Sequence, residues 1–133
     1  MSVQQRGIRG ATTAQKNEAT EILEATRRLL LEMAAANGVQ SGDLAAVFFT
    51  TTPDLNAEFP AAAARSLGWQ KVPLLCSTEI DVPGRLRSCV RVLMLVNTVL
   101  PQAQIRHIYL EGAARLRPDL SGEDDPQTAG TTF

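Results

Sequence analysis

The side chains of this chain best suited to chemistry are arginines placed among apolar neighbours or at the ends of expected secondary-structure elements. They are Arg9, Arg65, Arg91 and Arg117. A charge in such a place needs a partner, because an unpaired ion is costly to bury. Together the arginines indicate a site for an anionic ligand. Taken singly, each could instead form a salt bridge or extend its charged end to solvent.

The segment Arg6-Gly7-Ile8-Arg9-Gly10-Ala11-Thr12-Thr13 places one of these cations between residues too small or too apolar to compete for a charged ligand. Successive side chains of an extended strand point to opposite faces, so Arg6 and Arg9 cannot enter the same pocket. The alternative for this stretch is an edge strand whose arginines are solvated.

Three further groups complete the candidate chemistry. Glu79 follows an apolar stretch at residues 73–76, Cys76 supplies a thiol, and Tyr109 is the single tyrosine. The single histidine, His107, alternates with Ile108 in an expected short strand, which favours a hydrogen-bonded structural role over that of a base. The sequence has no nucleophile elbow, phosphate loop or dinucleotide fingerprint. Arginines, a carboxylate, a phenol and a thiol suit binding and electrostatic stabilisation better than nucleophilic attack.

Length and composition restrict the remaining possibilities. The 133 residues suit one domain, expected over residues 1–120, with a tail of non-periodic composition over residues 121–133. The net charge of −1 gives no general footprint for nucleic acid, and no apolar run reaches the length of a membrane span. The two cysteines form neither a metal motif nor a disulfide scaffold, so we expect a cytoplasmic protein without a metal.

Hydrophobic periodicity predicts the elements that position these groups. A long amphipathic helix is expected over residues 18–36, ended by Asn37-Gly38, and a short helix over residues 56–67 with Pro60 in its first turn. Strands are expected at residues 6–13, 44–52, 72–76, 89–98 and 106–110, those at 72–76 and 89–98 as buried strands, with a turn at residues 81–84. This order predicts an α+β or mixed α/β sheet with helices on one face. The other face would then be covered by self-association, which also creates clefts between subunits.

Several stretches in one order resemble a known family, the monofunctional AroH-type chorismate mutases, over residues 6–120. Besides the arginine-containing first segment they are Thr52-Pro53-Asp54-Leu55, Ala57, Phe59-Pro60-Ala61, Gly68-Trp69-Gln70, Val72-Pro73, Cys76, Glu79, Cys89-Val90-Arg91-Val92, Pro101-Gln102, Arg106-His107-Ile108-Tyr109-Leu110-Glu111 and Leu116-Arg117-Pro118-Asp119-Leu120. The resemblance implies a homotrimeric pseudo-α/β barrel with active sites at the subunit interfaces. It implies conversion of chorismate to prephenate by a Claisen rearrangement, with no cofactor.

The resemblance also implies roles for the reactive side chains. Arg91 would donate to the ether oxygen on which negative charge develops, and Glu79 would contact the ring hydroxyl and stabilise the positive character of the ring. Arg9 and Tyr109 match the residues that hold the enolpyruvyl carboxylate.

The remaining matches would form the walls and entrance of the site. Cys76 corresponds to a cysteine near the ring hydroxyl, Phe59 to a wall, and Arg65 to an arginine at the entrance that attracts the dianion. Leu116 with Arg117 matches a C-terminal segment that closes over the ligand.

Two departures from the family pattern stand near the site. Ala62 replaces a lysine that some relatives carry, so a direct lysine contact with the ring carboxylate is not expected, and one residue is missing before Gly68. Two other functions stay open on the sequence. They are a non-catalytic sensor of an aromatic-pathway metabolite and a trimeric enamine or imine deaminase of similar architecture.

Overall fold

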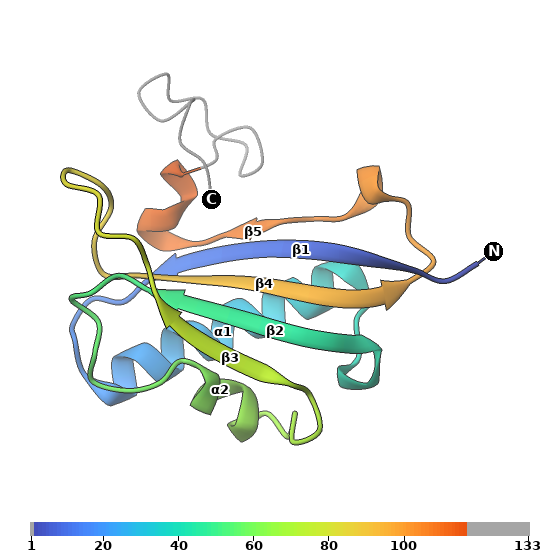
Figure 1. Ribbon diagram of the computed structural model, residues 1–133, viewed down its shortest axis with the longest axis horizontal. Coiled ribbons are helices and arrows are strands. Elements are labelled where there is room, and N and C mark those ends of the chain that lie inside the picture. Colours follow the sequence, from blue (N-terminus) through green and yellow to red (C-terminus); the bar gives the residue numbers. More distant parts are fainter. Residues whose placement is uncertain (1, 117–133) are drawn as a thin grey trace.

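The computed structural model describes residues 2–116 and consists of a five-stranded sheet with two helices (Figure 1). Its strands are β1 (Gln4–Thr13), β2 (Leu44–Thr51), β3 (Leu74–Thr78), β4 (Cys89–Thr98) and β5 (Ile108–Tyr109). The α-helices are α1 (Ala19–Asn37) and α2 (Ala61–Ser66), and the short 3-10 helices are η1 (Ser41–Asp43), η2 (Gln102–Gln104) and η3 (Glu111–Arg115). The expected tail and Arg117 lie outside the described residues.

The sheet is mixed, with strand order β3-β2-β4-β1-β5. β4 is the central strand and runs antiparallel to both β1 and β2, whereas β3 is parallel to β2 and β5 is parallel to β1. The β1–β4 pairing joins Gln4 to Thr98 and Thr13 to Cys89 without a shift in register. The expected mixed sheet is therefore confirmed.

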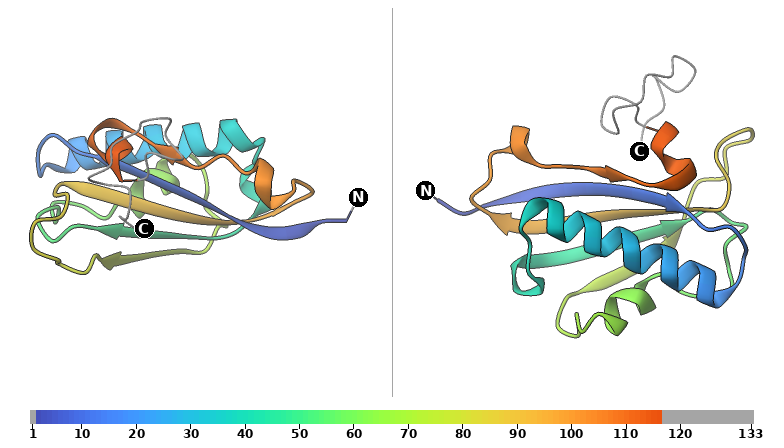
Figure 2. Two further views of the ribbon diagram at one scale, coloured as in Figure 1. Left: turned by 90° about the horizontal axis from the view of Figure 1, so that it is seen from above. Right: turned by 180° about the vertical axis from the view of Figure 1, so that it is seen from behind.

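Both α-helices lie on the same face of the sheet, as the view from behind shows (Figure 2). The buried side of α1 presents Ile22, Leu29, Leu30 and Met33 to the sheet, at the helical spacing expected from the sequence. A Cβ atom on Gly10 of β1 would collide with the sulfur of Met33, so the strand needs glycine for the helix to pack this closely. Gly38, with φ 63°, ends α1 in the left-handed conformation that the Asn37-Gly38 pair predicts.

The second helix is shorter than expected. It begins at Ala61, after Pro60, rather than at residue 56. The side-chain oxygen of Asn17 accepts hydrogen bonds from the backbone amides of Asn56 and Ala57, both at 3.0 Å, which ties this segment to the start of α1. Residues 56–59 therefore form a loop that reaches over the cavity described below.

The strand assignments need two corrections. β3 was expected to be buried, but it lies at the edge of the sheet and Leu75 is 59% exposed. The alternative of an edge strand for β1 is wrong at its C-terminal half, since β5 pairs with Gly10 and Ala11. The register of β1 against β4 places Arg6 and Arg9 on opposite faces, as their spacing predicts.

The face of the sheet opposite the helices carries apolar side chains that the described residues leave partly uncovered. Phe48 of β2 and Leu75 of β3 are paired neighbours with exposed fractions of 36% and 59%, and Leu93 and Leu95 of β4 continue the same face half-buried. We call this surface the open face. Within residues 2–116 no helix is both long and apolar enough to cross a membrane.

Candidate active site

A buried cation and a carboxylate lie together on the open face. The Nε atom of Arg91 is 3.7 Å from Oε2 of Glu79, and their side chains are 9% and 24% exposed. The Thr50 hydroxyl donates to the same carboxylate oxygen at 2.6 Å. A guanidinium and a carboxylate in a site with little water interact much more strongly with developing charge than they would in solvent.

Strand pairing explains how the pair is assembled. Arg91 stands on β4 directly opposite Thr50 of β2, so the two side chains leave the sheet side by side. Glu79 follows β3, and its backbone amide donates to the carbonyl of Thr51 at 2.8 Å. Three strands therefore fix one charged pair, and rigid strand positions suit a preorganised site.

Arg9 and Tyr109 lie on the same face of the sheet as Arg91. Ala11 of β1 pairs with Arg91 on one side and with Tyr109 on the other, and Arg9 is two residues before Ala11. The backbone amide of Arg9 donates to Nδ1 of His107 at 2.9 Å, which confirms the structural, hydrogen-bonded role expected for this histidine.

Leu116 packs into a small buried cluster beneath the end of β5. The cluster joins it to Ala11, Cys89, Tyr109 and Ala113, with η3 forming the cover. The described chain ends at Leu116, so the position expected for Arg117 is not described. The turn of chain that leads to this arginine is nevertheless anchored next to Tyr109.

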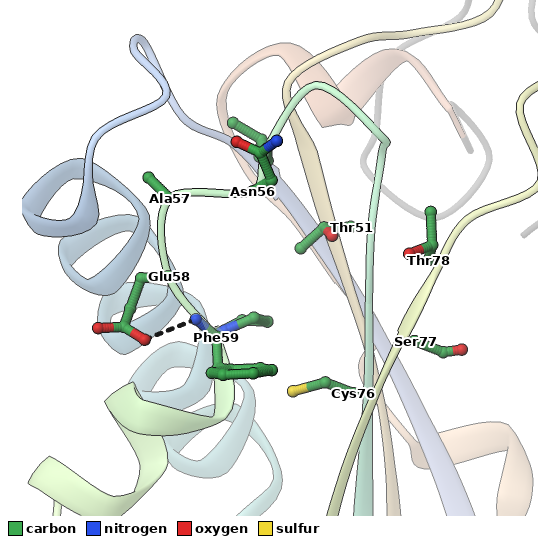
Figure 3. Close-up of a pocket in the computed structure, with 10 residues that line it drawn as sticks. Thr51, Asn56, Ala57, Glu58, Phe59, Cys76, Ser77 and Thr78 are labelled. Atoms are coloured by element: carbon green, nitrogen blue, oxygen red, sulfur yellow. Dashed lines mark hydrogen bonds between the residues drawn. The ribbon is translucent and has the colours of Figure 1, made fainter.

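A second group of expected site residues lines a cavity of about 320 Å³ on the helix side of β3 (Figure 3). Phe59, 67% exposed, and Cys76 face each other across it, and the Phe59 amide donates to the Glu58 carboxylate at 2.8 Å. Burial raises the pKa of the Cys76 thiol, while the Ala61 amide and the positive charge of Arg65 act in the opposite direction. Arg65 does not line the cavity, but it is in the last turn of α2, which contacts β3, the strand that carries Cys76.

The two groups are on opposite sides of the sheet within one chain. Cys76 pairs with Phe49, which is buried beneath the helices, whereas Glu79 meets Arg91 on the open face. The structure thus brings together Arg91, Glu79, Arg9, Tyr109 and Leu116 as one set, and Phe59, Cys76 and Arg65 as another. We call these the open-face group and the cavity group.

Sequence reasoning missed Thr50. Threonine is common in strands, and only the pairing of β2 with β4 shows that this one stands beside Arg91 and holds Glu79. Ala62, at the departure from the family pattern, is half-buried in α2. The described residues contain no group of three or more histidine, cysteine or acidic side chains placed to hold a metal ion.

Comparison with known proteins agrees with this geometry. The family model described as chorismate mutase type I matches residues 5–120. Chorismate mutase AroH of Thermus thermophilus is 55% identical over 116 residues, 86% of this chain and 95% of that protein. The Bacillus subtilis (strain 168) enzyme of the same name is 50% identical over 117 residues, 87% of this chain and 92% of that protein. A solved chorismate mutase from Clostridium thermocellum superposes with a TM-score of 0.80 at 51% identity, covering 80% of this chain and 96% of its own. With this extent of similarity, the chain belongs to the type I chorismate mutase family.

Proposed function

We propose that this protein is an isomerase that converts chorismate to prephenate. In this Claisen rearrangement the ether C–O bond breaks and a new C–C bond forms between the enolpyruvyl side chain and the ring. No atom, proton or electron is gained or lost overall, so the reaction needs no redox or group-transfer cofactor. The protein has to hold the side chain over the ring and stabilise the charge that develops.

The observation that carries this proposal is the fixed pairing of Arg91 with Glu79, 3.7 Å apart on three hydrogen-bonded strands. In the transition state the ether oxygen becomes negative and the ring becomes positive. A buried guanidinium facing the oxygen and a carboxylate facing the ring would match that separation of charge. Because the two groups are already held in place, little reorganisation is needed when the charges appear.

The other site residues have roles in binding. Arg9, two residues before Ala11, and Tyr109, the partner of Ala11 on β5, lie on the face of Arg91 and would hold the enolpyruvyl carboxylate. Arg65 would attract the dianionic substrate toward the cavity formed by Phe59 and Cys76. The last residue of the closing segment, Arg117, would add a cation over the bound ligand.

We further propose that the active enzyme is a homotrimer with shared sites. Two features support this assembly. The cavity group and the open-face group lie on opposite sides of one sheet, and the open face exposes Phe48 and Leu75. A cyclic arrangement would cover the apolar surface and place the cavity group of one chain against Arg91 and Glu79 of its neighbour. The two free thiols, Cys76 and Cys89, fit a reducing cytoplasm.

The test is turnover by purified protein without added metal or nucleotide. We expect the ultraviolet absorbance of chorismate to fall and prephenate to be identified as the product by mass spectrometry. Release of ammonia from an imine substrate would instead support a deaminase. Binding of chorismate without loss of absorbance would support a sensor, although membership of the chorismate mutase family favours neither alternative.

A further inference from the structure

The loop between β3 and β4, residues 79–88, connects the two central charges of the site along the chain. Glu79 is its first residue, and Arg91 follows its last residue by three positions. Both ends of the loop are held by one short segment, residues 51–54, at and just after the end of β2. The carbonyl of Thr51 accepts from the amide of Glu79 at 2.8 Å, and the carboxylate of Asp54 holds Ser88.

Asp54 and Ser88 are joined by two hydrogen bonds. Oδ2 of Asp54 accepts from the backbone amide and from the hydroxyl of Ser88, both at 2.9 Å. Burial acts to raise the pKa of Asp54, but the polar side chains of Thr52 and Ser88 and nearby backbone amides outweigh it and lower the pKa. The carboxylate is therefore charged at neutral pH, when its hydrogen bonds are strongest.

Ser88 adopts an unusual backbone conformation. Its φ is 55°, in the left-handed region that residues with a Cβ atom rarely occupy. Such a conformation persists only when surrounding contacts hold it. Besides the two bonds to Asp54, the carbonyl of Ser88 accepts from the amide of Ala14 at 2.9 Å. Ser88 is thus fixed at its amide, its side chain and its carbonyl.

The chain direction set at Ser88 passes directly to Arg91. The next residue, Cys89, forms two hydrogen bonds with Thr52. The Thr52 amide donates to the Cys89 carbonyl, and the Cys89 amide donates to the Thr52 hydroxyl oxygen, both at 3.0 Å. Two residues later Arg91 pairs with Thr50. A change in the backbone conformation of Ser88 would therefore shift the start of β4, only three residues before Arg91.

We propose that Asp54 is a positioning residue of the active site, whose carboxylate holds Ser88 in its left-handed conformation and so fixes Arg91 relative to Glu79. This inference rests on the proposed function. The carboxylate of Asp54 accepts hydrogen bonds from Ser88, three residues before Arg91, so its effect on the guanidinium is exerted through the backbone.

The experiment compares Asp54→Ala, Asp54→Asn and the double variant Asp54→Ala/Ser88→Gly with wild type. We expect Asp54→Ala to lower kcat by about tenfold to a hundredfold, the size of effect that small misplacements of a reacting group produce, with a smaller change in KM. Asp54→Asn keeps an acceptor oxygen and should lose less. Glycine adopts a positive φ readily, so the double variant should recover part of the lost kcat.

Asp43→Ala is the matched control. Its Oδ2 accepts from the amide of Gln40 at 2.9 Å, so it also removes a carboxylate that holds a turn, but at the other end of β2. We expect this variant to lose some thermal stability and to retain wild-type kcat. A kcat for folded Asp54→Ala within twofold of wild type, or a loss equal to that of Asp43→Ala, would overturn the inference.

A second readout separates this inference from the proposed function. Amide hydrogen exchange should be faster over residues 79–91 in Asp54→Ala than in wild type, and unchanged there in Asp43→Ala. If Asp54→Ala does not fold, the kcat of Asp54→Asn and its amide exchange rates over residues 79–91 test the positioning role instead. Wild-type protein without turnover would refute the proposed function, whereas a wild-type exchange pattern in the Asp54 variants would refute the positioning role alone.

Discussion

Arg91 and Glu79 form a charged pair whose geometry is set from outside the pair. The 3.7 Å separation of Nε and Oε2 accompanies a shorter contact of 2.6 Å between the carboxylate and the Thr50 hydroxyl. Thr50 therefore holds Glu79 more closely than Arg91 does. A pair held in this way can keep its shape while one member interacts with a substrate, which an isolated ion pair on flexible side chains cannot do.

Arg91→Lys should preserve the fold and remove most of the activity. Lysine retains the positive charge, but a single flexible ammonium cannot reproduce the fixed donors of a guanidinium. By comparison with the loss of one oxyanion donor, kcat should fall by about 10² to 10³. Steady-state kinetics and circular dichroism on the same preparation test this. Turnover within a few-fold of wild type would contradict the role given to Arg91.

Mixed trimers should test whether sites are shared between chains. One variant carries Arg91→Ala, and the other carries Phe59→Ala with Arg65→Ala, so each disables a different group. Random mixing in a cyclic trimer would recreate about a quarter of the sites with both groups intact, if each site takes one group from each of two neighbours. The activity of the co-refolded mixture is compared with that of each variant treated alone. No recovery in a mixture shown by light scattering to be trimeric would mean that both groups of a site come from one chain.

The two cysteines should differ sharply in reactivity. Cys89 is fully buried, and burial raises the pKa of its thiol to about 11, whereas Cys76 is only partly buried and faces the cavity. Because the thiolate is the reactive form, iodoacetamide at about pH 8 should label Cys76 first. Mass spectrometry of tryptic peptides over time measures both sites. A Cys76→Ser variant should remove the fast reaction, and rapid labelling of Cys89 would show that its surroundings open easily.

Acid should weaken the fold partly through Asp54. Its folded-state pKa lies below the ordinary value of 3.8, so the stabilisation is present above that value and is lost as the pH falls through the folded-state pKa. Urea unfolding midpoints measured between about pH 6 and about pH 3 should therefore fall less steeply for Asp54→Asn than for wild type. Parallel curves would show that Asp54 contributes nothing to the acid sensitivity.

Gly10→Ala should destabilise the protein, because the added methyl group meets Met33 of α1. Overpacking of this kind typically lowers the free energy of unfolding by about 1–3 kcal/mol. Urea denaturation gives the value. Gly42→Ala is the control, since a Cβ atom there has no neighbour within 4 Å. Equal stabilities for the two variants would mean that Met33 moves aside without loss.

The fold was largely predictable because its elements have strong local signals. The spacing of Ile22, Leu29 and Met33 predicted α1, and the mainly apolar, β-branched stretch of residues 89–98 predicted β4 with its observed bounds. β3 was misjudged because an apolar run indicates a strand without indicating its place in the sheet. Leu75 is apolar and yet exposed at the edge, in a position that only the strand order explains.

The residues proposed for the site could be chosen from the sequence, but their arrangement could not be predicted from it. The family resemblance identified Arg91 and Cys76, but whether their side chains share a face depends on the pairing partners Thr50 and Phe49. Pairing between residues tens of positions apart cannot be read from local periodicity. The same limit hid Asp54, whose Thr-Pro-Asp sequence predicts only the end of a strand, while its contact with Ser88 depends on the tertiary fold.

The central position of β4 also bears on how the molecule folds. β1 has its main partner in β4, with Gln4 opposite Thr98, so during synthesis β1 remains without that partner until the chain has been made through residue 98. Folding is slowed because a long loop must close before β1 and β4 can pair. Until then, the unpaired β1 can pair with other chains. The helix α1 has only local backbone hydrogen bonds, so it can form before β4 is made. Its apolar side can then pack against β1.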